Sequence, residues 1–290
     1  MKDLTSSIGL PDNYWPIYIK LPPGSNSIES LVSEYTGIMT FLSNISTDNT
    51  ITEFQGNTKQ IKFINYGDTQ LVFVITINDY KQYTLIVNQP ITPFGVGKTE
   101  YDNLKALSNK NDNVIKPMYY RTYDNRELYI TPYYHQARCL GITENSWGMW
   151  VPEPVYHFKI FSSEEKSVII SCMVALLINL YDEKNKKGLS GIRLDGGDFM
   201  LEKGFEDYDL NFENVLKRMK LIAARSLVQI DLDEYINVIR QELSRQVLDE
   251  QKLMIIGKSL GSPIALDTIE NGIRLGIDLR KKHREDTLHL

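Results

Sequence analysis

The most informative stretch of this sequence reads Gly191-Ile192-Arg193-Leu194-Asp195-Gly196-Gly197-Asp198-Phe199-Met200-Leu201. Its centre, Asp195-Gly196-Gly197-Asp198, has the composition of a turn, because glycine tolerates unusual backbone angles and aspartate bonds readily to nearby backbone groups. The apolar run Phe199-Met200-Leu201 is typical of a short buried strand. The stretch therefore predicts a charged loop or turn that leads directly into a strand.

The chain ahead of this stretch is rich in strands as far as about residue 130. Three short runs of β-branched and aromatic residues, at 60–64, 71–77 and 83–87, are separated by turn sequences. The turns are Asn65-Tyr66-Gly67-Asp68 and Asn78-Asp79-Tyr80-Lys81. We therefore expect three antiparallel strands in sequence.

One helix and two more strands follow. Residues 100–107 place Tyr101, Leu104 and Leu107 on one helical stripe. Residues 113–117 then lead into a strand, and residues 127–134 are typical of a buried strand that ends in a polar, aromatic connector. The predicted order is three strands, a helix and two strands, ahead of a helical second half.

This order resembles the protein kinase and aminoglycoside phosphotransferase superfamily over residues 55–225. The spacing of that family's αC helix and of the strand after it is matched by Glu100, Leu104, Leu107 and Val114-Ile115. Tyr83-Thr84-Leu85-Ile86 stands where the third strand carries V-A-I-K, and residues 191–201 align with H-R-D-L-x-x-x-N and its following strand. The resemblance implies an α+β, two-lobed protein-kinase-like fold, with an antiparallel sheet in the N-lobe and a mainly helical C-lobe.

We expect four regions along the chain. They are an N-terminal helical extension at 1–48, a strand-rich N-lobe at 49–135, an irregular aromatic connector at 136–161 and a helical C-lobe at 162–290. The extension is predicted to be helical because Asn26 and Glu29 have capping-box spacing ahead of an apolar stripe. The connector holds Trp147 and Trp150, which either pack in the interior or line a groove for a partner.

The helical half opens at another capping-box pair, Ser162 and Glu165, ahead of a run in which nearly every residue is apolar. We expect this run to form a central, almost wholly buried helix. Three further helices are predicted at 212–226, 231–245 and 263–280.

Composition narrows the classes of partner. A chain of 290 residues with 42% hydrophobic content can bury a sizeable core. The formal net charge is −5 and the lysines and arginines are scattered, which argues against a nucleic-acid partner.

The same sequence favours a cytoplasmic protein without a membrane span. The longest uncharged stretches, residues 82–97 and 167–181, are shorter than the roughly 20 apolar residues that cross a bilayer, and no apolar signal segment opens the chain. Cys139 and Cys172 are the only cysteines and match no metal-ligand or C-x-x-C spacing, so we expect reduced thiols.

The aligned catalytic loop lacks parts that phosphoryl transfer requires. Arg193 aligns with the catalytic Asp of the family, so a cation takes the place of a proton acceptor. Asp198 aligns with the metal-binding Asn. If the alignment with the kinase loop is shifted, Asp195 becomes the catalytic base. The other interpretation is that Asp195-Gly196-Gly197-Asp198 is a plain turn. For the metal-binding D-F-G the resemblance offers Asp207 and Asp209, which together with Asp198 either hold Mg²⁺ or form a solvated loop.

The parts that would contact a nucleotide are reduced as well. The glycine-rich loop is represented by Gly67 alone, and Ile86 stands at or near the position of the strand-three lysine. Lys98, just ahead of the αC-like helix, is either a relocated phosphate contact or a solvent-exposed lysine. Glu100, the usual partner of the missing lysine, is then expected to cap or solvate its helix.

A competing motif is Gly95-Val96-Gly97-Lys98-Thr99, which follows a predicted strand and precedes a helix, as a P-loop does. The motif G-x-x-x-x-G-K-[ST] needs a glycine where Thr92 stands, and Pro93 and Phe94 occupy positions that favour small residues. The match is therefore incomplete.

Three interpretations follow. The first is a pseudokinase-like protein with degenerate catalytic motifs that binds a protein partner as a regulatory or scaffolding module. The second is a divergent Mg²⁺-dependent ATP phosphotransferase acting on a small-molecule or protein hydroxyl, with Asp195 as the base, Asp198 and Asp209 on Mg²⁺ and Lys98 at a phosphate. The third is an unrelated α+β protein in which the kinase pattern is coincidental.

Overall fold

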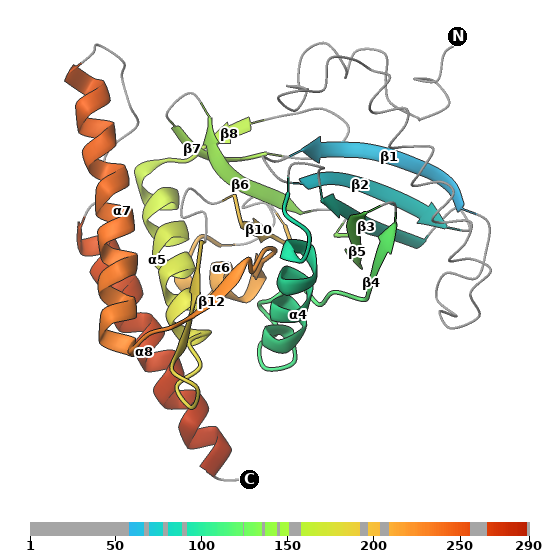
Figure 1. Cartoon of the computed structure of the whole chain (residues 1–290). Coiled ribbons are helices and arrows are strands. Elements are labelled where there is room, and N and C mark those ends of the chain that lie inside the picture. The colour runs from blue at the N-terminus through green and yellow to red at the C-terminus, as the bar shows by residue number, and fades with distance from the viewer. Residues whose placement is uncertain are drawn as a thin grey trace. The chain divides into compact units, whose positions relative to one another are not determined.

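The structure is a computed structural model. It describes residues 58–66, 70–77, 81–88, 92–123, 125–134, 137–143, 146–150, 158–191, 197–203, 209–255 and 266–288. The predicted N-terminal extension at 1–48 lies outside this set. The described residues combine antiparallel sheets with helices, which confirms the α+β fold class (Figure 1).

The described residues belong to two compact units. Unit 1 contains those up to Tyr101 together with Lys116–Tyr133, and unit 2 contains Asp102–Ile115 together with those from Tyr134 onward. The chain therefore passes from unit 1 to unit 2 within a helix and returns before the next strand.

Five antiparallel strands form the sheet of unit 1. They are β1 (Thr58–Tyr66), β2 (Gln70–Ile77), β3 (Lys81–Asn88), β4 (Tyr119–Tyr123) and β5 (Arg126–Pro132). The order across the sheet is β1-β2-β3-β5-β4. Apolar side chains of the central strands, among them Phe73, Leu85 and Ile130, are at most 1% exposed. The strands predicted at 60–64, 71–77, 83–87 and 127–134 are confirmed.

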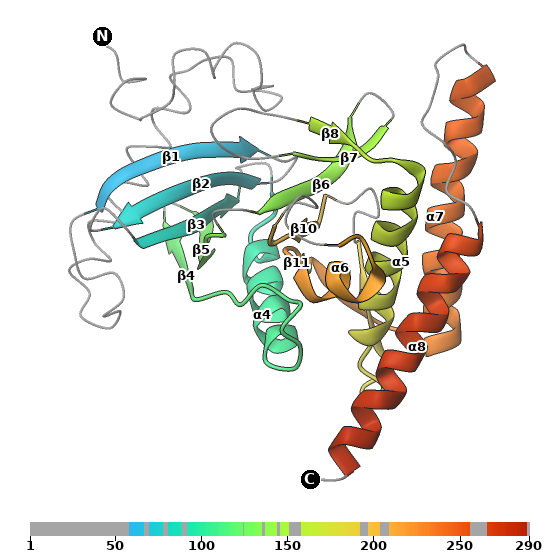
Figure 2. The same ribbon diagram turned by 180° about the vertical axis from the view of Figure 1, so that it is seen from behind.

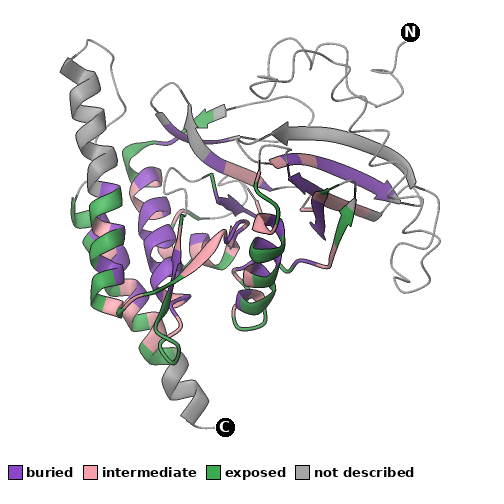
Figure 3. Cartoon of the chain, in the orientation of Figure 1, coloured by how far each residue is buried: buried purple, intermediate pink, exposed green. Residues whose placement is uncertain are grey.

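Helix α4 (Val96–Ser108) follows β3. Tyr101, Leu104 and Leu107 are buried, whereas Lys98 and Lys105 are exposed, so the predicted apolar stripe forms the inward face (Figure 3). The helix begins four residues before the predicted start at residue 100, and the reason lies in the contacts of its first turn, described below.

A second five-stranded sheet, in unit 2, shows that the prediction of an irregular connector at 136–161 was wrong. Its strands are β6 (Arg138–Thr143), β7 (Ser146–Trp150), β8 (Phe158–Ile160), β10 (Phe199–Leu201) and β11 (Met219–Leu221), in the order β11-β10-β6-β7-β8. The tryptophans belong to a β-hairpin in which Thr143 pairs with Ser146, and Trp147 is 3% exposed. Residues distant in sequence complete the sheet, so a local pattern did not reveal it.

The helix predicted at 212–226 is also corrected. Helix α6 (Phe212–Arg218) is short, because the residues after it pair as β11 with β10, with Phe199 opposite Leu221. The side-chain amide of Asn113 donates to the carbonyls of Leu216 and Met219, where the helix gives way to the strand. Strand β12 (Ser226–Gln229) then pairs with β9 (Lys187–Ser190) in a two-stranded sheet. Tertiary pairing has overridden helical propensity here.

Three long helices of unit 2 lie side by side in both ribbon views (Figures 1 and 2). They are α5 (Ser163–Asn179), α7 (Leu232–Ile255) and α8 (Leu266–Leu288). The capping box of Ser162 and Glu165 is confirmed at the start of α5, and all residues from Ile169 to Ile178 are buried. No helix of the described residues is long and apolar enough to span a membrane.

Helix α8 approaches α5 closely enough to exclude a side chain at Gly272 and at Gly276. A Cβ added to Gly276 would lie 2.8 Å from the Cβ of Ile178 and 3.0 Å from the backbone of Ala175. Further along, Arg280 donates to the carbonyls of Ile178 and Tyr181, which satisfies the C-terminus of α5. The helix pair therefore depends on backbone approach as well as on apolar burial.

We predict that Gly276→Val destabilises the protein. The larger side chain must push α8 away from α5, at a cost of about 2 to 3 kcal/mol, whereas Arg274→Ala on the exposed face of α8 should change stability by less than about 0.5 kcal/mol. Urea unfolding followed by circular dichroism compares the two. Equal stability of Gly276→Val and wild type would show that α8 does not pack this tightly.

Candidate functional site

Four of the eight residues predicted from the kinase pattern are described by the structure. Lys98 and Glu100 lie on α4, Asp198 precedes β10, and Asp209 precedes α6. Lys98 and Glu100 belong to unit 1, and Asp198 and Asp209 belong to unit 2. The other four, Gly67, Arg193, Asp195 and Asp207, lie outside the described residues.

The first turn of α4 is bound by a carboxylate from the sheet. Glu127 on β5, 2% exposed, accepts hydrogen bonds of 2.9 Å from the backbone N–H groups of Gly95, Gly97 and Lys98. The hydroxyl of Tyr120 on β4 donates to the same carboxylate at 2.7 Å. A helix N-terminus carries unsatisfied N–H groups and a partial positive charge, so a buried carboxylate is a strong partner for it.

Glycine is required at the centre of this contact. A Cβ at Gly97 would lie 2.5 Å from the side-chain nitrogen of Asn88 and 2.9 Å from the Cβ of Glu127. Gly97 therefore allows the strands to approach the helix, whereas Gly95 is placed by its positive φ of 97° and not by crowding. The N–H groups that a P-loop would present to a phosphate are instead bonded to a carboxylate of the chain itself.

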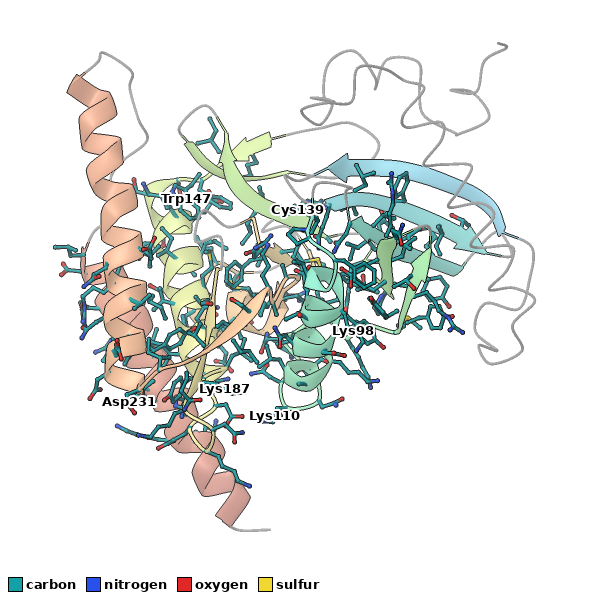
Figure 4. The ribbon with its side chains drawn as sticks, viewed as in Figure 1. Lys98, Lys110, Cys139, Trp147, Lys187 and Asp231 are labelled. Carbon is teal, nitrogen blue, oxygen red and sulfur yellow. The ribbon has the colours of Figure 1, made fainter. Side chains whose placement is uncertain are left out.

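Lys98 donates its backbone N–H to Glu127, while its side chain extends over aromatic rings (Figure 4). Its ammonium lies 5.7 Å from the ring centroid of Tyr101 and 5.5 Å from that of Tyr120, which is the range of cation–π attraction. The residue is exposed, so the tyrosine rings stabilise the ammonium without removing it from water.

Glu100 corrects the expectation that it caps or solvates its helix. The residue is fully buried, and the side-chain amide of Gln70 on β2 donates to its carboxylate. Gln70 also contacts Asn88, its cross-strand neighbour on β3, and Asn88 in turn donates to Glu127 at 3.4 Å. A buried polar network therefore joins α4 to three strands of the sheet. Ile86, which stands near the aligned position of the strand-three lysine, is also buried, with 8% exposure.

Asp198 is the buried one of the two described aspartates in the predicted acidic trio. Its side chain is 1% exposed and forms an ion pair with Arg225, whose side chain is 29% exposed. The same nitrogen of Arg225 lies 3.3 Å from the carbonyl oxygen of Gly191. Asp198 therefore has a cationic side chain at hydrogen-bond distance.

Asp209 has a different environment. It is exposed, and its backbone carbonyl accepts from the N–H of Asn211, whose side chain caps α6 by accepting from the N–H of Asn214. Among the described residues, no group of three or more His, Cys, Asp and Glu side chains is arranged to hold a metal ion.

The strands on either side of position 195 do not pair with each other. Strand β9 pairs with β12, whereas β10 pairs with β6 and β11. Residues 191–198 therefore link strands that belong to two different sheets.

Both cysteines are unlinked thiols; Cys172 is buried and Cys139 is half-buried. Cys139 lies on β6 (Figure 4) and Cys172 on α5. Burial raises the pKa of both thiols, to about 12 for Cys139. Both are consequently protonated at neutral pH, which makes them poor nucleophiles and poor metal ligands.

The sequence interpretation missed Glu127, Gln70 and Arg225. An acidic residue at the start of an otherwise apolar strand, as in Glu127-Leu128-Tyr129-Ile130, is a signal that could have identified Glu127, because a buried carboxylate needs partners. Gln70 and Arg225 stand in no recognisable motif, and only the strand pairing brings them to Glu100 and Asp198.

Comparison with known proteins finds similarity among solved structures. No family model matches the chain, and no curated protein matches it. Among solved structures, the autoinhibited serine kinase domain of the giant muscle protein titin is similar to it, with a TM-score of 0.42 and 10% sequence identity. The alignment covers 73% of this chain and 64% of that one, less than two thirds of its length. A TM-score of this size does not establish a shared fold, so the α+β assignment stands on the strands and helices themselves.

We predict that Glu127→Gln destabilises the protein by about 2 to 4 kcal/mol. The amide cannot satisfy all of the buried N–H donors that the carboxylate accepts, and unsatisfied buried donors are costly. Glu164→Gln, at an exposed position of α5, is the matched control and should leave urea unfolding unchanged. An unaffected Glu127→Gln variant would show that this contact does not hold α4.

The same carboxylate predicts a pH dependence. Burial raises the pKa of Glu127, but the hydrogen bonds from Tyr120, Gly97, Lys98 and Gly95 outweigh burial and hold it below its ordinary value of 4.5. A lowered pKa in the folded state contributes stability above about pH 4.5, and this contribution is lost as the pH falls through the lowered value. The stability difference between wild type and Glu127→Gln should therefore be constant from about pH 7 to 5 and shrink below it. Urea unfolding at each pH measures it, and a difference that grows on acidification would contradict the assignment.

Proposed function

We propose that this chain is a kinase-like binding protein that does not transfer phosphate and acts as a regulatory or scaffolding module for another protein. The observation that carries this proposal is the hydrogen bond between Gln70 and Glu100. In an active kinase the equivalent glutamate pairs with the strand-three lysine, and that lysine neutralises the phosphates. Here a neutral amide is bonded to the glutamate, and Ile86 stands near the lysine position.

The phosphate-binding alternative at the start of α4 is weakened by Glu127. Three N–H groups of the glycine-containing turn are bonded to its carboxylate. A nucleotide phosphate would have to displace a buried carboxylate and then place its own negative charge beside it. Electrostatic repulsion and desolvation both oppose this exchange.

The described acidic residues also fit Mg²⁺ poorly. Mg²⁺ is usually held by one or two carboxylates together with water and phosphate oxygens, at about 2.0 to 2.1 Å. Asp198 is ion-paired with Arg225, and Asp209 is exposed beside the cap of α6. Together with Arg193 at the aligned base position, these features favour a binding role over phosphoryl transfer.

The test is a phosphotransfer assay on the purified full chain with labelled ATP, and Mg²⁺ or Mn²⁺ in parallel. We expect no label on the chain itself, on a generic protein acceptor or on a small alcohol, while an active kinase in the same buffer provides the positive control. Transfer that Asp195→Asn abolishes and Arg193→Ala preserves would instead support the phosphotransferase.

Thermal unfolding gives an independent reading. A ligand at 100 times its dissociation constant adds about 2.7 kcal/mol of stability, which would raise the unfolding midpoint by roughly 5 °C or more. We expect no rise of this size when Mg²⁺ and ATP are added together. A rise that requires both would contradict the proposal.

A further inference from the structure

We infer that the guanidinium of Arg225 is a resident cation at Asp198, and that it holds Gly191 and Asp198 together without a metal ion. This inference goes beyond the proposed function, because it concerns which group neutralises Asp198. It can be tested whatever the result of the phosphotransfer assay. The starting point is that Asp198 fits Mg²⁺ poorly, because Arg225 is already paired with its carboxylate.

The contact geometry joins both ends of the stretch quoted first. One nitrogen of Arg225 donates to the carboxylate of Asp198 and lies 3.3 Å from the carbonyl oxygen of Gly191. Two oxygens from the two ends of residues 191–198 thus converge on a single positive group. Neutralising a carboxylate and gathering oxygen ligands are the tasks of a bound divalent cation.

The fold positions Arg225 from both sides. Before it, the N–H of Ile222 donates to the carbonyl of Asp198 at 2.8 Å, next to the pairing of β10 with β11. After it, Ser226 is paired with Ser190 across β12 and β9, and their hydroxyls are hydrogen-bonded. Arg225 is therefore fixed by two backbone pairings, which distinguishes it from an isolated surface ion pair whose side chains are mobile.

A metal ion and this arginine would compete for the same carboxylate. The side chain of Asp198 is 1% exposed, so its negative charge depends on a partner inside the protein. Binding a cation there would require Arg225 to leave, and the guanidinium would then lose both Asp198 and Gly191. The wild-type chain should consequently show no binding of Mn²⁺ that depends on Asp198.

The experiment uses the full chain with Mn²⁺ alone as the probe. The electron paramagnetic resonance signal of free Mn²⁺ measures how much of the ion is bound. We expect that wild type does not bind Mn²⁺ through Asp198, and that EDTA does not change its unfolding midpoint. Arg225→Met keeps the apolar stem without the charge, so its midpoint should fall by about 5 to 10 °C. The amide of Ile222 should lose protection from hydrogen exchange.

Two variants separate a charge effect from a packing effect. Arg225→Lys retains a cation and should keep most of the stability, within about 3 °C of wild type. Arg240→Met breaks the exposed ion pair with Glu270, in which both side chains are more than a third exposed, and should change the midpoint by no more than about 2 °C. In Arg225→Met, Mn²⁺ should restore part of the lost midpoint, and adding Asp198→Asn should abolish the restoration.

Three results would overturn the inference. The first is Mn²⁺ binding by wild type that Asp198→Asn removes, which would make Asp198 an available metal ligand. The second is an unchanged midpoint and unchanged protection of Ile222 in Arg225→Met. The third is an equal loss in Arg225→Lys and Arg225→Met, which would assign Arg225 a role in shape alone. Phosphotransfer by a wild type that passes these tests would contradict the proposed function and leave this inference standing.

Discussion

The carboxylate of Glu127 at the start of α4 is the contact on which the arrangement of unit 1 depends. It joins the helix to β5 through three backbone N–H groups, and Tyr120 and Asn88 extend the contact to the neighbouring strands. A buried carboxylate must be hydrogen-bonded, and a helix N-terminus must find acceptors, so each group removes the other's desolvation cost. This mutual requirement sets where α4 begins, and it explains the glycine at position 97, where a side chain would collide with the strands.

The same principle recurs at two described positions where the kinase pattern would place a group that contacts nucleotide or metal. Glu100 is bonded to Gln70, and Asp198 is paired with Arg225. In both cases a carboxylate that the kinase alignment would direct at a ligand is bonded to another side chain of the chain itself. Removing one partner of such a buried pair is costly, because the other polar or charged group then stays buried without compensation. Both contacts support the binding role that we propose over phosphoryl transfer.

Sequence reasoning succeeded where the responsible interactions are local. The first three strands, the apolar face of α4 and the capping box of α5 follow from periodicities and spacings within about ten residues, and the structure confirms them. It failed where distant residues decide the outcome. Residues 219–221 form a strand because β10 pairs with them, and the tryptophan-containing connector forms strands because it shares a sheet with β10 and β11.

The candidate site shows the same difference between what the local sequence predicts and what distant contacts decide. The kinase resemblance of the printed sequence predicts that Arg193 and Ile86 stand where an enzyme needs an aspartate and a lysine. For this prediction the sequence is enough, because residue identity alone decides whether a proton acceptor or a cation is present. Side-chain partners could not be obtained in this way. Gln70 meets Glu100 across 30 positions, Arg225 meets Asp198 across 27 and Glu127 meets Gly97 across 30. Only the pairing of strands and the docking of a helix bring such residues within hydrogen-bond distance, since these contacts are fixed by backbone register and burial over the whole unit.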